Sequence, residues 1–131
     1  MLLELAAGSL LAAAQPQFTP PRPAVECAEF LTDWRARHSC LRDLLSDAED
    51  ALSDAADGAR EEARLIDEDT AGQFRAEAQF DTAQSAWIAY RDAECDRRVA
   101  LMFISEQSRE EIGLDCRISL TRDRARELRE E

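Results

Sequence analysis

The stretch AQSAWIAYRDAEC, which runs from Ala83 to Cys95, carries the strongest structural signal in this chain. An α-helix turns by about 100° per residue, so positions three, seven and eleven residues after Gln84 lie on the same face as Gln84. Those positions hold Trp87, Arg91 and Cys95. One face of a predicted helix therefore carries an amide, an indole, a guanidinium and a thiol. The face belongs either to a core helix with amphipathic side chains or to a cluster of functional groups.

The composition predicts one mostly helical domain. A chain of 131 residues is long enough for a single modest core. It has only four Gly and four Pro and is rich in Ala, Leu, Glu and Arg, which favour helices. We therefore predict an all-α fold.

The charge of the chain indicates the kind of partner. The net charge is −12, and all 16 basic residues are arginine. Such a surface repels nucleic acid and anionic membranes and attracts a cationic protein.

Four cysteines occur in this short chain: Cys27, Cys40, Cys95 and Cys116. An even number in a short chain is typical of two disulfides in an oxidising compartment. A zinc site is the alternative, but no C-x-x-C spacing occurs and the one histidine, His38, is not spaced as a ligand. We expect disulfides, with no metal and no cofactor.

The N-terminal residues resemble the apolar part of an export signal. Ala12 and Ala14 occupy the −3 and −1 positions of a small-residue cleavage site before Gln15. The apolar run is shorter than the roughly 20 residues of a membrane span. No basic residue precedes the run and Glu4 interrupts it, so a frayed N-terminal helix is the alternative. We predict a signal peptide over residues 1–14, without a lipid anchor because no cysteine stands at the cleavage point.

A proline-rich tether is predicted between this signal and the folded domain. It spans residues 15–23 and contains Pro16, Pro20, Pro21 and Pro23. The folded domain is predicted over residues 24–131.

The first long helix is predicted to start at an N-cap on Thr32 and to run to about Ile66. Gly58 is expected to be a weak point or a bend. His38 is interpreted as a partly buried, satisfied side chain rather than a catalytic one. The apolar seam of the helix consists of His38, Leu41, Leu45, Ala48, Leu52, Ala55, Ala59 and Ile66.

A second series on this helix is acidic and faces away from the seam. Its spacing of three and four residues makes a continuous stripe about 27 Å long. The stripe is either an ordinary solvated face or a docking surface for a basic partner. It cannot form a calcium loop, because regular helical spacing does not wrap carboxylates around one ion. The acidic stripe consists of Asp43, Asp47, Asp50, Asp54, Asp57 and Glu61.

Two further helices are expected. The second follows a tight connection over residues 67–70, is capped by Asp69 or Thr70, and ends near Phe103. For the third, Ser108 and Glu111 fit a capping box. Residues 112–120 alternate as a strand would, but a helical seam also runs through them, and we predict helix. That seam consists of Leu114, Ile118, Thr121, Ala125 and Leu128.

The spacing of the cysteines favours one of the three possible pairings. Two antiparallel helices joined midway between Cys95 and Cys116 would bring these residues level, within the roughly 6 Å that a disulfide requires. Cys27 and Cys40 would lie about 20 Å apart in one unbroken helix, so their pairing requires the chain to fold back before Thr32. We predict the pairs 27–40 and 95–116. The expected architecture is an antiparallel three-helix bundle, with two long helices and a shorter C-terminal one, stapled by two disulfides.

The same residues resemble a known family, the LprI-type lysozyme inhibitors. The matching positions are Gln84, Trp87, Tyr90, Arg91, Asp92 and Cys95, followed by Cys116, Thr121, Arg124 and Leu128. The resemblance covers about Cys27 to Leu128. Glu49 and Ser53 depart from it, since the family usually has Asp and Asn there. The Gly-Gly-Ser turn common before the last cysteine is also missing.

The resemblance implies a small exported bacterial domain, periplasmic or secreted, that has two disulfides and inhibits lysozyme. The motif residues are expected to be structural, and the binding surface is expected on another face. We therefore predict a protein that binds lysozyme or another basic protein. An envelope interaction module with a different partner is the alternative, as is an intracellular protein with free thiols if the N-terminus is not a signal. An enzyme is not supported, because one histidine without a phosphate loop or a metal cluster offers no catalytic constellation.

Overall fold

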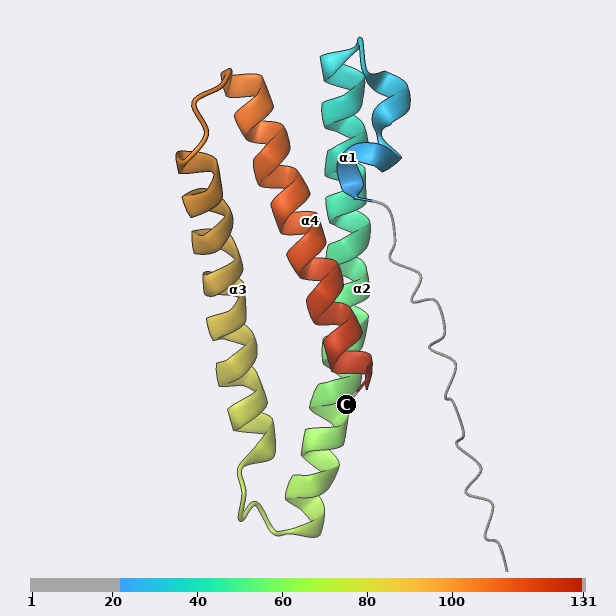
Figure 1. The fold of residues 1–131 in the computed structure, drawn as a ribbon. Coiled ribbons are helices and arrows are strands. Elements are labelled where there is room, and N and C mark those ends of the chain that lie inside the picture. The colour runs from blue at the N-terminus through green and yellow to red at the C-terminus, as the bar shows by residue number, and fades with distance from the viewer. Residues whose placement is uncertain (1–21, 131) are drawn as a thin grey trace, which may run out of the picture.

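The computed structural model describes residues 22–130, which form helices and their connections. Two short elements, α1 (Pro23–Glu26) and the 3₁₀ helix η1 (Ala28–Phe30), precede three long helices, α2 (Trp34–Asp69), α3 (Ala76–Ala100) and α4 (Glu106–Glu130). Successive long helices run antiparallel and form a three-helix bundle (Figure 1). The predicted all-α fold is confirmed, including helix for residues 112–120.

The helices differ in length from our expectation. α2 has 36 residues, whereas α3 and α4 each have 25, so the C-terminal helix is not shorter than the second one. α2 also continues through Gly58, which is exposed, and a Cβ atom added at this position would meet no other atom within 4 Å. The glycine therefore does not end or divide the helix.

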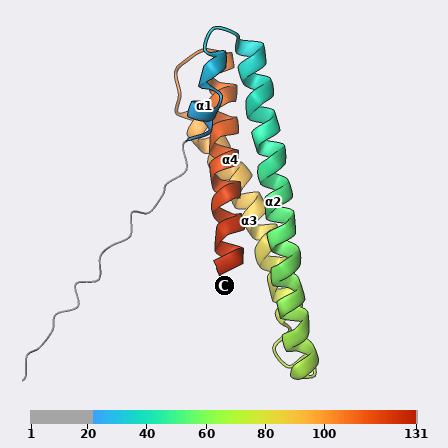
Figure 2. The ribbon, with the colours of Figure 1, turned by 90° about the vertical axis from the view of Figure 1, so that its right-hand side faces the viewer.

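The core lies mainly between α2 and α4, which form the most extensive contact of the bundle. One cluster of buried side chains consists of Cys27, Leu41, Ala48 and Ile118, and a second consists of Leu52, Ala55, Ala125 and Leu128. Ile66 of the predicted seam is 48% exposed. It is exposed because α2 extends beyond the C-terminal end of α4 (Figure 2).

α3 has little core of its own. Cys95 is the one residue of this helix that is fully buried, although Phe80 and Trp87 pack against the second cluster. Cys95 is bonded to Cys116 on α4 across a Cα–Cα distance of 5.6 Å, which confirms the predicted pair. A bridge that closes a loop of this size stabilises a fold by about 3 kcal/mol.

The chain folds back before α2, as the other predicted disulfide requires. Cys27 and Cys40 are bonded across a Cα–Cα distance of 5.9 Å. The N-cap of α2 is Asp33, whose side chain accepts a hydrogen bond from the N–H of Ala36 at 3.1 Å. The prediction of Thr32 was wrong by one residue, because both side chains can cap and the backbone turn places the carboxylate of Asp33 at the helix start.

Arg37 stabilises this fold-back. Its guanidinium donates to the carbonyl oxygen of Leu31 at 2.8 Å and to Glu111 of α4 at 2.7 Å. Glu26 of α1 accepts two hydrogen bonds from Arg122 of α4, at 2.6 and 3.1 Å. The N-terminal elements are therefore attached to both α2 and α4.

The connection between α2 and α3 uses a cap that the sequence did not indicate. The carboxylate of Asp67 accepts from the N–H of Ala76 at 2.7 Å and from the N–H of Glu77 at 3.1 Å. The predicted caps were wrong, because α2 continues to Asp69 and ends with Thr70 as its C-cap. A side chain from the last turn of one helix thus caps the next helix.

The connection between α3 and α4 also starts earlier than predicted. α3 ends at Ala100 rather than near Phe103. Ser105 accepts from the N–H of Ser108 at 3.2 Å, so Ser105 takes the capping role and α4 begins one residue later. The predicted capping box of Ser108 and Glu111 was wrong, because both residues already lie within the helix.

The predicted signal peptide and most of the predicted tether lie outside the described residues. Pro23, which we assigned to the tether, is buried and is the first residue of α1. Within residues 22–130, no helix combines the length and the apolar character needed to cross a bilayer.

Replacing Asp67 with alanine should lower the free energy of unfolding by about 1 kcal/mol, because two N–H groups at the start of α3 lose their acceptor. Urea unfolding followed by circular dichroism measures the change. Asp69→Ala is the matched control, since it removes the same charge from an exposed side chain two residues away. Equal losses in the two variants would contradict the capping role of Asp67.

Candidate functional site

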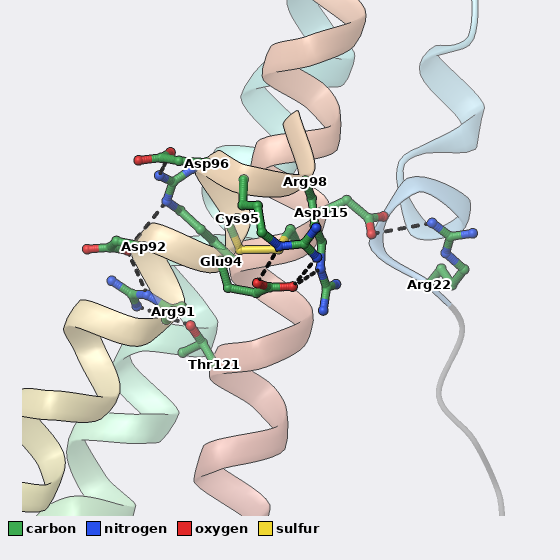
Figure 3. Close-up of a disulfide and its surroundings, with 12 residues drawn as sticks. Arg22, Arg91, Asp92, Glu94, Cys95, Asp96, Arg98, Asp115 and Thr121 are labelled. Carbon is green, nitrogen blue, oxygen red and sulfur yellow. Dashed lines mark hydrogen bonds and ion pairs between the residues drawn. A yellow bond between two sulfur atoms is a disulfide. The ribbon is translucent and has the colours of Figure 1, made fainter. Parts of the chain in front are cut away.

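The motif face of α3 forms a polar clasp with α4 beside the disulfide of Cys95 (Figure 3). The side chain of Arg91 is only 11% exposed. It donates to the hydroxyl of the buried Thr121 at 3.2 Å and to Asp92 at 3.0 Å. Its guanidinium carbon lies 5.6 Å from the centre of the Trp87 ring. The guanidinium is therefore held from three directions.

The second part of the clasp lies further along α4. Arg124 donates to the side-chain oxygen of Gln84 at 3.2 Å. Leu128 is buried in the cluster against which Trp87 packs. The motif residues therefore meet between α3 and α4, except Tyr90, which is 56% exposed. These contacts support a structural role for the motif.

Glu49 of α2 faces the clasp from the third long helix. Its carboxylate lies 3.7 Å from the guanidinium of Arg91. The carboxylate therefore places a negative charge beside the clasp. Arg91 contacts groups from all three long helices.

Glu94 is the carboxylate whose electrostatic environment departs furthest from that of a free side chain. It accepts two hydrogen bonds from Arg97, at 2.8 and 2.7 Å, and one from Arg98 at 3.0 Å (Figure 3). The hydrogen bonds from Arg97, and then those from Arg98, lower the pKa of Glu94 from its usual 4.5 to about 2. The carboxylate remains charged throughout the neutral and mildly acidic range.

The acidic stripe of α2 is open to solvent. All six of its side chains are exposed. Glu61 is paired with Arg64, whose hydrogen bond lowers the pKa of Glu61. No described basic residue forms an ion pair with the other end of the stripe, which consists of Asp43, Asp47, Asp50 and Asp54. The negative charge of these four aspartates is therefore not balanced by ion pairs within the described residues.

A groove of about 920 Å³ lies between α2, the end of α3 and the start of α4. Its apolar lining includes Leu45, Val99 and Leu114, while charged side chains of both signs surround it. His38 also lines it, with its Nε2 3.5 Å from the carboxylate of Glu110. The histidine is partly buried, as predicted. Within residues 22–130, no group of three or more His, Cys, Asp and Glu side chains is arranged to hold a metal.

The sequence interpretation missed one surface. Leu101, Met102, Phe103 and Ile104 form the connection between α3 and α4 and are all exposed. We call these four residues the 101–104 loop. Most of it was predicted to be helix, because an apolar run at the end of an amphipathic helix looks like a continuation of its buried face. The available signal was four consecutive apolar residues directly before the polar segment at Ser105.

Replacing Glu94 with glutamine should change how stability depends on pH. Because the pKa of Glu94 is lowered on folding, the carboxylate stabilises the fold above about pH 4.5, and this contribution is lost as the pH falls toward 2. Wild type should therefore exceed the variant in stability above about pH 5, with the difference vanishing toward pH 2. Thermal unfolding over a pH series measures it. Glu62→Gln, at an exposed position, is the control, and a similar pH-dependent difference in that variant would contradict the assignment.

The observed disulfides and motif contacts agree with a comparison of this chain with known protein families. Residues 25–128 match the sequence model of a family described as "Lysozyme inhibitor LprI". Comparisons with curated proteins and with solved structures gave no match. The matched range covers most of the chain and includes all four cysteines and the whole motif. The chain therefore belongs to the LprI family of lysozyme inhibitors.

Proposed function

We propose that this protein is an exported inhibitor that binds a cationic muramidase of the lysozyme type through its acidic surface. The observation that carries this proposal is the family match over residues 25–128. The family consists of lysozyme inhibitors, so the protein acts by binding and needs no catalytic residue of its own.

The acidic stripe supports the choice of a cationic partner. It extends over about 27 Å of α2, and its aspartates from Asp43 to Asp54 have no basic partner among the described residues. With a net charge of −12 on the whole chain, the surface attracts a basic protein over several ångströms. Attraction of this kind raises the association rate and depends strongly on ionic strength.

Export is supported by the N-terminal residues and by the cysteines. Residues 1–14 carry the apolar run and the small-residue cleavage pattern of a signal peptide. All four cysteines are engaged in two disulfides, which persist in the periplasm or outside the cell. A muramidase that attacks the cell wall would be met in the same compartment.

Neutralising the centre of the stripe should weaken inhibition. The variant Asp47→Asn, Asp50→Asn, Asp54→Asn removes three negative charges from one exposed helix face. The association rate with a cationic lysozyme should fall about tenfold at low salt and approach that of wild type at high salt, where charges are screened. Lysis of cell-wall suspensions measures inhibition, and surface-plasmon kinetics measure the association rate.

The control carries the same change in net charge at other exposed sites: Glu29→Gln, Glu62→Gln and Asp69→Asn. It should associate with lysozyme at nearly the wild-type rate. If both triple variants associate equally, the stripe is only a solvated face. If wild-type protein at tens of micromolar does not slow lysis at low salt, the proposed function is wrong and the protein serves another partner.

Mass spectrometry of the protein isolated from its natural host should show a chain that begins at Gln15. Alkylation without reduction should leave the mass of the chain unchanged, because no thiol is free to react. Reduction before alkylation should add four alkyl groups. A full-length chain that takes up four groups without reduction would contradict export.

A further inference from the structure

The 101–104 loop lies at one end of the bundle (Figure 1). Its four consecutive side chains are apolar and exposed. Leu101 is 69% exposed, Met102 40%, Phe103 108% and Ile104 48%. Soluble proteins avoid exposed apolar runs of this length unless the run contacts something, because each side chain orders water without any gain from packing. The fold gains nothing from this exposure.

The loop is held in place from both sides. Its first two N–H groups donate to the last turn of α3, from Leu101 to the carbonyl of Arg98 at 3.3 Å and from Met102 to that of Val99 at 3.0 Å. Ser105 caps the start of α4 directly after it. The disulfide at Cys95 fixes the two helices that carry it. A loop held in this way loses little conformational freedom when it binds, which favours affinity.

The segment that carries the loop is less acidic than the chain as a whole. Residues 97–109 contain three arginines and a single carboxylate, whereas the whole chain has a net charge of −12. Arg97 and Arg98 both pair with Glu94, yet their side chains are still 59% and 45% exposed, and Arg109 is also exposed. Exposed guanidinium groups therefore border the apolar tip, and their N–H groups that Glu94 does not use suit a partner site that carries carboxylates.

The size of the patch indicates how it is used. Its side chains expose on the order of 500 Å². Stable complexes bury roughly 800 Å² on each partner, so two copies of the loop pressed together would not form a stable dimer. A protruding aromatic side chain with apolar neighbours is instead typical of an anchor that enters a concave site.

We infer that the 101–104 loop enters the substrate cleft of the muramidase, with Phe103 as the central anchor. This inference rests on the proposed function and adds the element that occupies the cleft. Glycoside hydrolases of this kind cleave sugar chains between two carboxyl groups in a cleft, and the arginines that border the loop complement those groups. The acidic stripe on α2 then speeds the encounter, while the loop holds the complex and blocks the sugar chain.

The two surfaces should therefore affect different rate constants. Phe103→Ser should raise the dissociation rate from lysozyme about tenfold or more, since loss of a central anchor acts mainly on dissociation. The association rate and its salt dependence should change less than about twofold, because no charge is altered. Surface-plasmon kinetics at several salt concentrations separate these quantities.

Phe74→Ser is the matched control. Phe74 is 62% exposed and lies in the connection between α2 and α3, at the other end of the bundle. Its replacement should leave both rate constants unchanged. Thermal unfolding of the two variants checks that each keeps the wild-type fold.

Competition with a ligand of the lysozyme cleft tests whether the loop enters that cleft. A short N-acetylglucosamine oligomer that occupies the lysozyme cleft should reduce binding of the wild-type protein. Binding that is unaffected by the oligomer, or a Phe103→Ser variant that dissociates like wild type, would overturn the inference while leaving the proposed function intact. Anionic phospholipid vesicles test a membrane as the alternative partner. If wild-type protein sediments with the vesicles and Phe103→Ser does not, while both dissociate from lysozyme at the same rate, the loop binds a membrane and the inference is overturned too. A wild-type protein that does not bind lysozyme at all would overturn both proposals.

Discussion

The disulfide between Cys95 and Cys116 is the attachment on which α3 depends. Cys95 is the one fully buried residue of that helix, whereas α2 and α4 share most of the apolar core. Around the bridge, Arg91 contacts Thr121 on α4 and faces Glu49 on α2. Covalent and charge-assisted contacts thus replace the hydrophobic burial that α3 lacks. A small domain with a thin core commonly relies on such bridges.

The contacts of the motif residues support a structural role for them. The guanidinium of Arg91 is largely enclosed, and its partners hold it in one orientation. The groups that remain free to meet a partner lie elsewhere. They are the acidic stripe on the outer face of α2 and the 101–104 loop at the end of the bundle. In the proposed complex, the clasp contributes to binding indirectly, because it fixes the helices that present the loop.

The sequence predicted those features that follow from periodicity and from pairing geometry. Helical spacing placed Gln84, Trp87, Arg91 and Cys95 on one face, and the spacing of the cysteines favoured the two disulfides that are observed. Helix ends were less predictable, because several capping residues stand close together and tertiary contacts select among them. Asp67 caps α3 from the preceding helix, a contact that local sequence patterns do not encode. The loop at Phe103 was missed because an apolar run does not show whether a neighbouring element covers it.

We therefore propose two separate binding surfaces and a structural role for the clasp between α3 and α4. Hydrogen exchange of the protein, with and without a cationic lysozyme, tests this division most directly. We predict slower exchange in residues 101–105 and in the exposed face of α2 from Asp43 to Asp54, with no change in the connection over residues 70–75. Protection confined to residues 70–75, or no protection at saturating lysozyme, would contradict this division.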